Sequence, residues 1–257
     1  MTKLFQKDQV GFSLVWIGVY TVGMSLFEEL SRAIGVESCG AAVFAMALSG
    51  FLLMWVQKNG LMAYFGLCKP KVQAKACLYY LPLAAITACN LWSGVSVHYD
   101  AVGTAFFVLK MLCVGFLEEL IFRGFLFKGM CKSSPKWAII VSSVTFGIGH
   151  IVNLFNGSGM GLADNLFQIV SAVAIGFLYV VIFYGSGSLL PCILSHGMFN
   201  ALSAFAGAPA SPQWQLVLRA ILCLLAVGYT FVLWKTLRPK QNSQDSQERN
   251  HAKQAPL

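Results

Sequence analysis

Residues 101–122 read AVGTAFFVLKMLCVGFLEELIF, an apolar run that is long enough to cross a lipid bilayer. About 20 apolar residues are needed for a helix to span the ~30 Å hydrocarbon core. Two adjacent acids, Glu118 and Glu119, interrupt the run near its end. A charged side chain at the middle of a membrane helix costs roughly 2.5 to 3.5 kcal/mol on insertion scales, so these acids indicate a functional site.

The rest of the chain is similarly apolar. Of its 257 residues, 57% are hydrophobic and only 11% are charged. The mean hydropathy is +0.69, and a soluble domain of this size could not bury so much apolar surface. We predict an all-α, multi-pass transmembrane bundle of about eight helices. The expected spans are residues 10–27, 39–56, 74–92, 101–122, 137–155, 164–184, 188–206 and 214–234.

The placement of charges orients these spans. The net charge is +8, and the lysines and arginines fall mainly at the N-terminus, between alternate spans and in the C-terminal tail, whereas the predicted outer loops hold only Arg32. Because lysine and arginine are enriched on the cytoplasmic side, we expect both termini to be cytoplasmic. We interpret the basic charge as a topological signal and not as a nucleic-acid-binding surface. The outer loops are expected to carry the acids Glu28, Glu29, Glu37, Asp100 and Asp164.

Three sections of the chain differ in composition. Residues 1–73 are predicted to form two transmembrane helices followed by a basic connector that lies on the inner leaflet. Residues 74–234 are predicted to form a six-helix body, which contains all the motifs between residues 116 and 200. Residues 235–257 are polar and lack the apolar side chains needed to fold alone, so we expect a disordered cytoplasmic tail. The first run is itself long enough to span, so no cleavable signal peptide is expected.

The acidic pair lies in the sequence Phe116-Leu-Glu-Glu-Leu-Ile-Phe-Arg-Gly124. Glu119 and Arg123 are four residues apart and can form an ion pair on one helix face, whereas Glu118 points about 100° away. This arrangement leaves one carboxylate for chemistry. The alternative is that both acids pair with basic residues at the cytoplasmic end of the helix.

Two other predicted spans carry the remaining polar candidates. His150 follows Phe146 by four residues, and Asn200 follows His196 by four residues, so each pair shares a helix face. A single histidine on an apolar helix is more often a hydrogen-bonded core residue, and polar side chains also hold membrane helices together. These two are, however, the only histidines within predicted spans, and their joint occurrence with the acids favours a common site.

Together these groups suit the hydrolysis of a peptide bond. A carboxylate with an imidazole beside it can draw a proton from water as the water attacks an amide carbonyl, and it can then return that proton to the leaving amine. The second imidazole and the carboxamide can stabilise the negative charge on the carbonyl oxygen, at roughly 3 to 4 kcal/mol per well-placed donor.

The ordered motifs EExxxR, FxxxH and HxxxN on successive helices resemble those of the CPBP family of intramembrane proteases. That family includes the type II CAAX prenyl endopeptidases and bacterial proteins linked to bacteriocin self-immunity. The resemblance covers about residues 101–206, and it implies four catalytic side chains and three supporting ones. The catalytic set is Glu118 with His150 for water activation and His196 with Asn200 for oxyanion stabilisation, and the supports are Glu119, Arg123 and Phe146.

Several alternatives stay open at the level of the sequence. A glutamate and two histidines could supply three ligands to a catalytic zinc ion, with water in the fourth position, although no HExxH motif is present. We favour glutamate catalysis that requires no cofactor. A proton-coupled transporter could use the same groups as a relay, and an inert immunity or scaffold protein could retain them without catalysis.

The expected partners are membrane lipid and a peptide or membrane-protein substrate. The compact length favours a bacterial cell membrane, and the sequence makes no prediction of the oligomeric state. Counting ~1.5 Å of helix rise per residue, we expect the active site in the cytoplasmic half of the membrane, open to water from that side.

Overall fold

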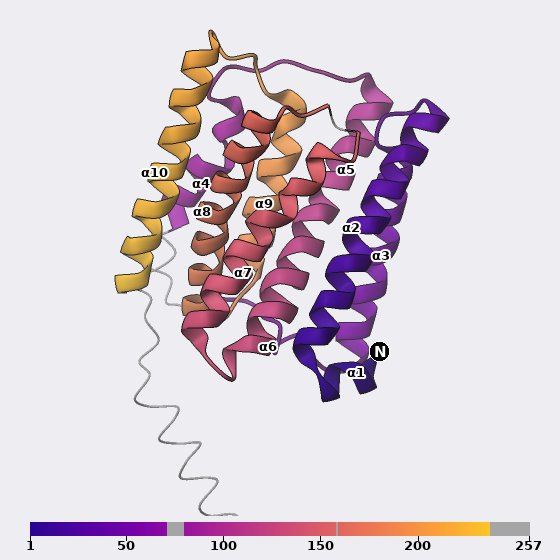
Figure 1. Ribbon diagram of the computed structural model, residues 1–257, viewed down its shortest axis with the longest axis vertical. Coiled ribbons are helices and arrows are strands. Elements are labelled where there is room, and N and C mark those ends of the chain that lie inside the picture. The colour runs from indigo at the N-terminus through magenta and orange to yellow at the C-terminus, as the bar shows by residue number, and fades with distance from the viewer. Residues whose placement is uncertain (71–79, 158, 237–257) are drawn as a thin grey trace, which may run out of the picture.

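All regular secondary structure in the described residues, 1–70, 80–157 and 159–236, is helical (Figure 1). In this computed structural model the helices are, in chain order, α1 (Thr2–Lys7), α2 (Gln9–Ile34), α3 (Cys39–Lys58), α4 (Leu81–Thr87), η2 (Cys89–Leu91), α5 (Ala101–Glu118), η3 (Glu119–Phe127), α6 (Lys128–Cys131), α7 (Pro135–Gly149), η4 (His150–Leu154), α8 (Leu162–Ser186), α9 (Leu190–Leu202), η5 (Ser203–Phe205) and α10 (Pro212–Thr236).

The first two long helices, α2 and α3, form a hairpin at one edge of the bundle (Figure 1). Asp8 begins α2 because its carboxylate accepts a hydrogen bond from the backbone N–H of Gly11 at 2.9 Å, which satisfies a helix N-terminal donor. Gly35 ends α2 in the left-handed conformation, with φ of 76°. Glycine adopts this conformation without steric cost, so α2 stops there and the chain turns back into α3.

A single helical path runs from α5 through η3 into α6. Asp100 begins it by accepting a hydrogen bond from the N–H of Gly103 at 2.7 Å. The backbone stays right-handed at both junctions, at Glu119 and at Lys128, but η3 is a π-helix of nine residues. Stretches of π-helix are rare and are frequent at functional sites. The acidic pair lies at the start of this one.

Helix α9 packs directly against α5, and two glycines allow the approach. A Cβ atom built on Gly115 would lie 2.4 Å from the backbone nitrogen of Gly197, which is too close for any larger residue without movement of a helix. Small residues at a contact let membrane helices approach closely. This contact brings the motif on α9 beside the acids at the end of α5.

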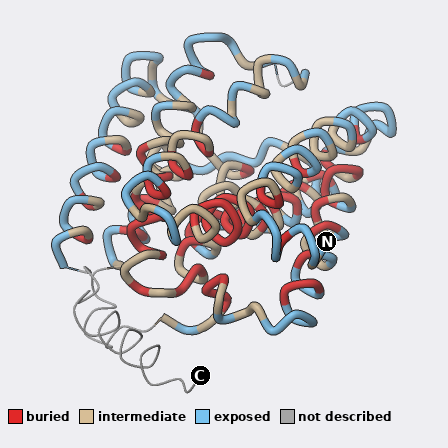
Figure 2. Tube along the Cα trace, turned by 60° about the horizontal axis from the view of Figure 1, so that its bottom comes forward, coloured by how far each residue is buried: buried red, intermediate tan, exposed pale blue. Residues whose placement is uncertain are grey.

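Among the described residues, five helical stretches are long and apolar enough to cross a membrane: Gln9–Ile34, Cys39–Lys58, Pro135–Leu154, Leu162–Ser186 and Pro212–Thr236. The stretch Leu190–Phe205 is apolar but shorter. Buried residues concentrate in the middle of the bundle (Figure 2), whereas large side chains such as Leu26, Leu224 and Phe231 are exposed on its outside. Such an apolar exterior is suited to lipid, and we conclude that the chain is an integral membrane protein.

The predicted all-α class is confirmed, while the count of about eight spans and the cytoplasmic termini stay predictions. Of the span expected at residues 74–92, residues 74–79 lie outside the described residues. From residue 80 onward the chain forms the short helices α4 and η2, and not a spanning helix. Most of the tail expected at residues 235–257 also lies outside the described residues, which end at residue 236.

Candidate active site

The ion pair expected inside the first motif is present and completely buried. Arg123 Nη1 lies 3.0 Å from Glu119 Oε1, and neither side chain is accessible to solvent. None of the three guanidinium nitrogens has good hydrogen-bond geometry to a described acceptor. The guanidinium instead lies over the ring of Phe146, 4.0 Å from its centroid, where a cation is attracted to the face of an aromatic ring. Phe146, from α7, thus supports the arginine as well as shielding it.

His196 bridges the two acids. Its Nδ1 lies 2.9 Å from Glu119 Oε1, and its Nε2 lies 3.4 Å from Glu118 Oε2. The side chain is only 8% exposed. Both ring nitrogens therefore face acids. A carboxylate oxygen accepts hydrogen bonds, and an imidazole N–H group donates one.

The orientation of α9, and hence of His196, is fixed by the preceding residue. Ser195 Oγ lies 2.7 Å from Thr87 Oγ1 on α4 and 3.0 Å from the hydroxyl of Tyr179 on α8. The Tyr179 ring also lies against the His196 ring, with 5.7 Å between centroids. Hydrogen bonds between membrane helices hold them in one relative rotation, and this set directs His196 toward α5.

Glu118 differs from Glu119 because it reaches a cavity. Its side chain is 13% exposed, and its Oε1 accepts a hydrogen bond of 2.6 Å from the hydroxyl of Tyr20 on α2. Glu118 is therefore contacted from two other helices, by the Tyr20 hydroxyl of α2 and by the His196 ring of α9. A hydrogen bond to a charged acceptor is worth about 1.5 to 3 kcal/mol, so the Tyr20 hydroxyl restricts where this carboxylate can point.

His150 lies where α7 tightens into the 3-10 turn η4. Its Nδ1 lies 3.1 Å from the carbonyl oxygen of Phe146. A carbonyl can only accept, so Nδ1 carries the proton in the neutral ring and Nε2 is left as an acceptor. The carbonyl of His150 itself accepts a hydrogen bond from Asn165 of α8 at 2.8 Å. This tautomer suits a group that takes a proton from water.

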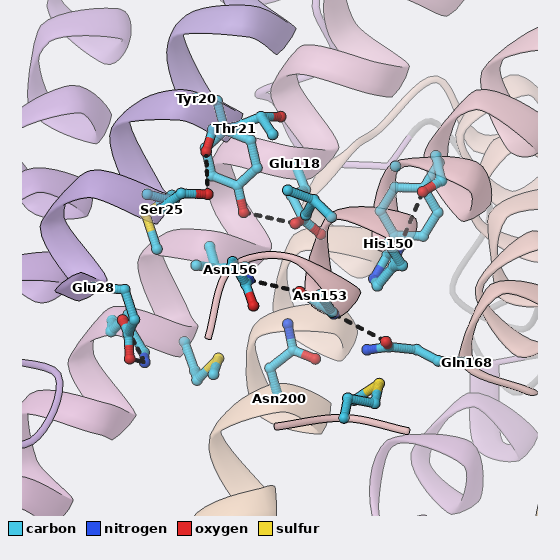
Figure 3. Close-up of a pocket in the computed structure, with 18 of the residues that line it drawn as sticks. Tyr20, Thr21, Ser25, Glu28, Glu118, His150, Asn153, Asn156, Gln168 and Asn200 are labelled. Carbon is cyan, nitrogen blue, oxygen red and sulfur yellow. Dashed lines mark hydrogen bonds and ion pairs between the residues drawn. The ribbon is translucent and has the colours of Figure 1, made fainter. Parts of the chain in front are cut away.

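Glu118, His150 and Asn200 line one cavity of about 360 Å³, shown in Figure 3. They come from α5, from the end of α7 and from α9. Asn200 makes no hydrogen bond to the other residues drawn in Figure 3, and its carboxamide is directed into the cavity. His196 is not among the residues that line this cavity, so the sequence-predicted site residues separate into a group on the wall and a buried group behind it.

Amide side chains form another part of the wall. Asn156 donates to Asn153 at 3.0 Å, and Asn153 donates to Gln168 at 2.9 Å. These three residues join the turn after α7 to the start of α8 (Figure 3). Carboxamides both donate and accept, so such a wall can bind the N–H and C=O groups of an extended peptide.

Two contributors were missed by sequence reasoning. Tyr20 is 98 residues away from Glu118 in the chain, and no motif singles it out within its apolar helix. Lys110 lies within the expected span 101–122, and the structure pairs it with Glu28 Oε2 at 3.2 Å and with Ser38 Oγ at 2.7 Å. Glu28 and Glu29 were expected in an outer loop, which is wrong: α2 continues to Ile34, and Glu28 lies in the cavity wall, where Lys110 balances its charge.

The zinc alternative finds little support in the arrangement of donors. Within the described residues, no group of three or more His, Cys, Asp or Glu side chains is placed to hold a metal ion. A catalytic zinc ion needs three protein ligands around an open position, and both nitrogens of His196 already face carboxylates. We therefore derive no chemical step through a metal.

One comparison with known families matches the segment that carries these residues. Residues 100–202 match the family model described as type II CAAX prenyl endopeptidase Rce1-like. The matched segment runs from the residue before α5 to the end of α9, and it contains all seven residues that the motifs predicted. The match confirms the resemblance to the CPBP family of intramembrane proteases for this segment. Curated proteins and solved structures give no match.

Proposed function

We propose that this chain, whose residues 100–202 match the Rce1-like type II CAAX prenyl endopeptidases, is an intramembrane endopeptidase. Its substrate is a peptide or protein that is associated with the membrane or carries a lipid. One observation carries the proposal. A carboxylate, an imidazole and a carboxamide from three separate helices face the same cavity inside an apolar bundle, and among the described residues neither the imidazole Nε2 nor the carboxamide has a hydrogen-bond partner.

The reaction begins with a water molecule between Glu118 and His150. As its oxygen attacks the carbonyl carbon of the scissile peptide bond, its proton passes to the Glu118 carboxylate, while His150 Nε2 orients the water as an acceptor. The proton then moves from Glu118 to the departing nitrogen as the C–N bond breaks. The products are a carboxylic acid and an amine, and Glu118 is returned to its starting form.

Asn200 is the donor best placed for the developing oxyanion. Its N–H groups face the cavity and are not taken up by the residues drawn around it (Figure 3). His196 lies between the acids, and for its Nε2 to reach an oxyanion it would have to leave Glu118 Oε2. We therefore propose that His196 first positions Glu118, and that any contact with the oxyanion requires this movement.

The experiment is a cleavage assay with purified protein in lipid nanodiscs. Membrane peptides released from cells that carry the wild type are compared with those from Glu118→Gln cells, and the peptides unique to the wild type are synthesised as substrates. Glu118→Gln and His150→Ala should abolish cleavage, whereas Glu29→Gln, at an exposed acid of α2, should leave it unchanged. Identical peptide profiles, together with no cleavage by the purified wild type, would refute the proposal.

A proton-coupled transporter is the second candidate, because Arg123, Glu119, His196, Glu118 and Tyr20 form a continuous chain of polar contacts. A relay must connect the two faces of the membrane. This chain of contacts ends at Arg123, which is completely buried and therefore does not reach the second face of the bundle. The geometry therefore supports a hydrolase better than a relay. An inert immunity protein would protect cells even as the Glu118→Ala variant.

A further inference from the structure

The two ends of the bundle differ in charge. One end, at the bottom of Figure 1, includes α1, α6 and the last turns of α3 and α10. The opposite end, at the top, includes the last turn of α2 and the first turns of α5, α8 and α10. We call the first the lysine-rich end, with Lys3, Lys7, Lys58, Lys69, Lys128, Lys132, Lys136 and Lys235, and the second the acidic end, with Glu28, Glu29, Glu37, Asp100 and Asp164. Arg32 and Arg219 also lie at the acidic end, where they pair with Glu29 and Asp164.

The cavity extends from Glu118 toward the acidic end. On α2 its lining residues run from Tyr20 to Arg32, a distance of about 18 Å along the helix axis. On α5, which runs in the opposite direction, they extend from Glu118 back to Lys110, about 12 Å. The third wall follows the end of α7 and the turn up to Asn156. Glu118 thus lies at one end of the lined space and Arg32 at the other, where Arg32 donates a hydrogen bond to the carbonyl oxygen of Asn156 at 3.0 Å. We infer from this extent that the mouth is at the acidic end.

The opposite side of Glu118 is closed by an aromatic cluster of Phe5, Phe12, Trp55, Phe65 and Phe125. These rings come from α1, α2, α3, the segment after α3 and η3, and all five are buried. Phe12 and Phe65 each lie 5.0 Å from Phe125, and Phe12 lies 5.1 Å from Trp55. Phe12 is about 12 Å from Tyr20 along α2, toward the lysine-rich end. Within the described residues, these close-packed rings leave no path for a peptide from that side.

We propose that the substrate reaches Glu118 from the acidic end of the bundle, as a polypeptide segment present on the side of the membrane opposite the lysine-rich end. Lysine-rich ends of membrane proteins face the cytoplasm, so the substrate is a membrane-anchored or exported segment on the non-cytoplasmic side. This access differs from the cytoplasmic opening expected from counting residues. The proposal rests on the proposed function only in calling the entering segment a substrate. The direction in which the cavity opens does not depend on catalysis.

The proposal restricts the substrate class. A lipidated tail presented at the lysine-rich face would have to cross the bilayer before it met Glu118. A segment already translocated could enter in an extended form along the wall formed by Asn153, Asn156 and Gln168. Main-chain groups of an unfolded segment would find partners on these carboxamides.

Cysteine accessibility tests the direction of the mouth without any activity assay. Single cysteines are introduced into the full chain, with its eight native cysteines replaced by serine or alanine. Ser25→Cys reports on the cavity wall, Val95→Cys on the exposed loop at the acidic end, and Ser133→Cys on the exposed turn between α6 and α7 at the lysine-rich end. Ser13→Cys, at a fully buried position of α2, is the unreactive control. A membrane-impermeant sulfonated maleimide is applied to intact cells and then to permeabilised cells.

The expected result is full labelling of Ser25→Cys and Val95→Cys in intact cells, and labelling of Ser133→Cys only after permeabilisation. Labelling of Ser133→Cys in intact cells, or of Ser25→Cys only from the cytoplasmic side, would overturn the proposal. If the cysteine-free background does not fold, Ser25→Cys, Val95→Cys and Ser133→Cys are read in the native background by mass spectrometry of the labelled peptides. A failure of the protease proposal would leave the labelling pattern unchanged, so the two can be judged separately.

Discussion

Removing the charge of Arg123 should destabilise the protein far more than removing that of Arg32. Both arginines pair with a glutamate on the same helix, Arg123 with Glu119 and Arg32 with Glu29. The first pair is completely inaccessible to solvent, whereas the second has 40% and 71% of its side chains exposed. The chain therefore contains its own control for the effect of burial on an ion pair.

The magnitude follows from the environment of Arg123. In Arg123→Met the new side chain has a similar length, but the buried Glu119 keeps only its contact with His196. Breaking a buried pair by removing one partner costs about 3 to 5 kcal/mol, and methionine recovers part of the lost contact with the Phe146 ring, so we expect about 3 to 4 kcal/mol. At ~2 to 4 °C per kcal/mol, the melting temperature should fall by roughly 6 to 16 °C.

The measurement is thermal unfolding of the purified protein in detergent, followed by circular dichroism or by tryptophan fluorescence. Arg32→Met should change the melting temperature little, because exposed pairs are screened by water. The double variant Arg123→Met with Glu119→Gln should recover most of the loss, because no uncompensated charge is left. Equal shifts for Arg123→Met and Arg32→Met, or a double variant less stable than Arg123→Met, would refute the reasoning.

Three further outcomes follow from single contacts. Tyr20→Phe removes the donor to Glu118 and should lower kcat/KM in the cleavage assay roughly 10- to 150-fold, from about 1.5 to 3 kcal/mol for a hydrogen bond to a charge; an unchanged rate would show that Tyr20 only packs. Asn200→Ala should lower kcat by about 10²- to 10³-fold with little effect on KM if its amide holds the oxyanion, and a change in KM alone would assign it to binding. Gly115→Ala should lower the melting temperature because its Cβ meets the backbone of α9, whereas Gly18→Ala, with open space around it, should be neutral or stabilising.

The direction of the cavity determines from which side of the membrane such a site would be used in a cell. The cavity that Glu118 lines opens away from the lysine-rich end, and the aromatic cluster closes the side toward that end. Water and peptide therefore reach Glu118 only from the acidic end. The peptides collected for the cleavage assay should therefore come from the medium and from the outer surface of cells as well as from their membranes.

The local features of the protein could be predicted from the amino-acid sequence. Seven of the eight segments expected from apolar runs agree closely with helices of the structure. A long apolar run in lipid becomes helical because its backbone groups must form hydrogen bonds with one another. The spacing of four residues also predicted the contact of Glu119 with Arg123 and that of Phe146 with His150, because helix periodicity alone brings such residues onto one face.

Only the tertiary structure decided which groups from different helices meet. The rotation of each helix and the tilt between helices come from contacts such as Gly115 against Gly197 and Ser195 against Tyr179, and no local periodicity encodes them. Packing between helices places His196 between the two acids and brings Tyr20 to Glu118 across 98 residues of chain. Periodicity predicts the face on which a side chain lies, but packing determines what that face meets.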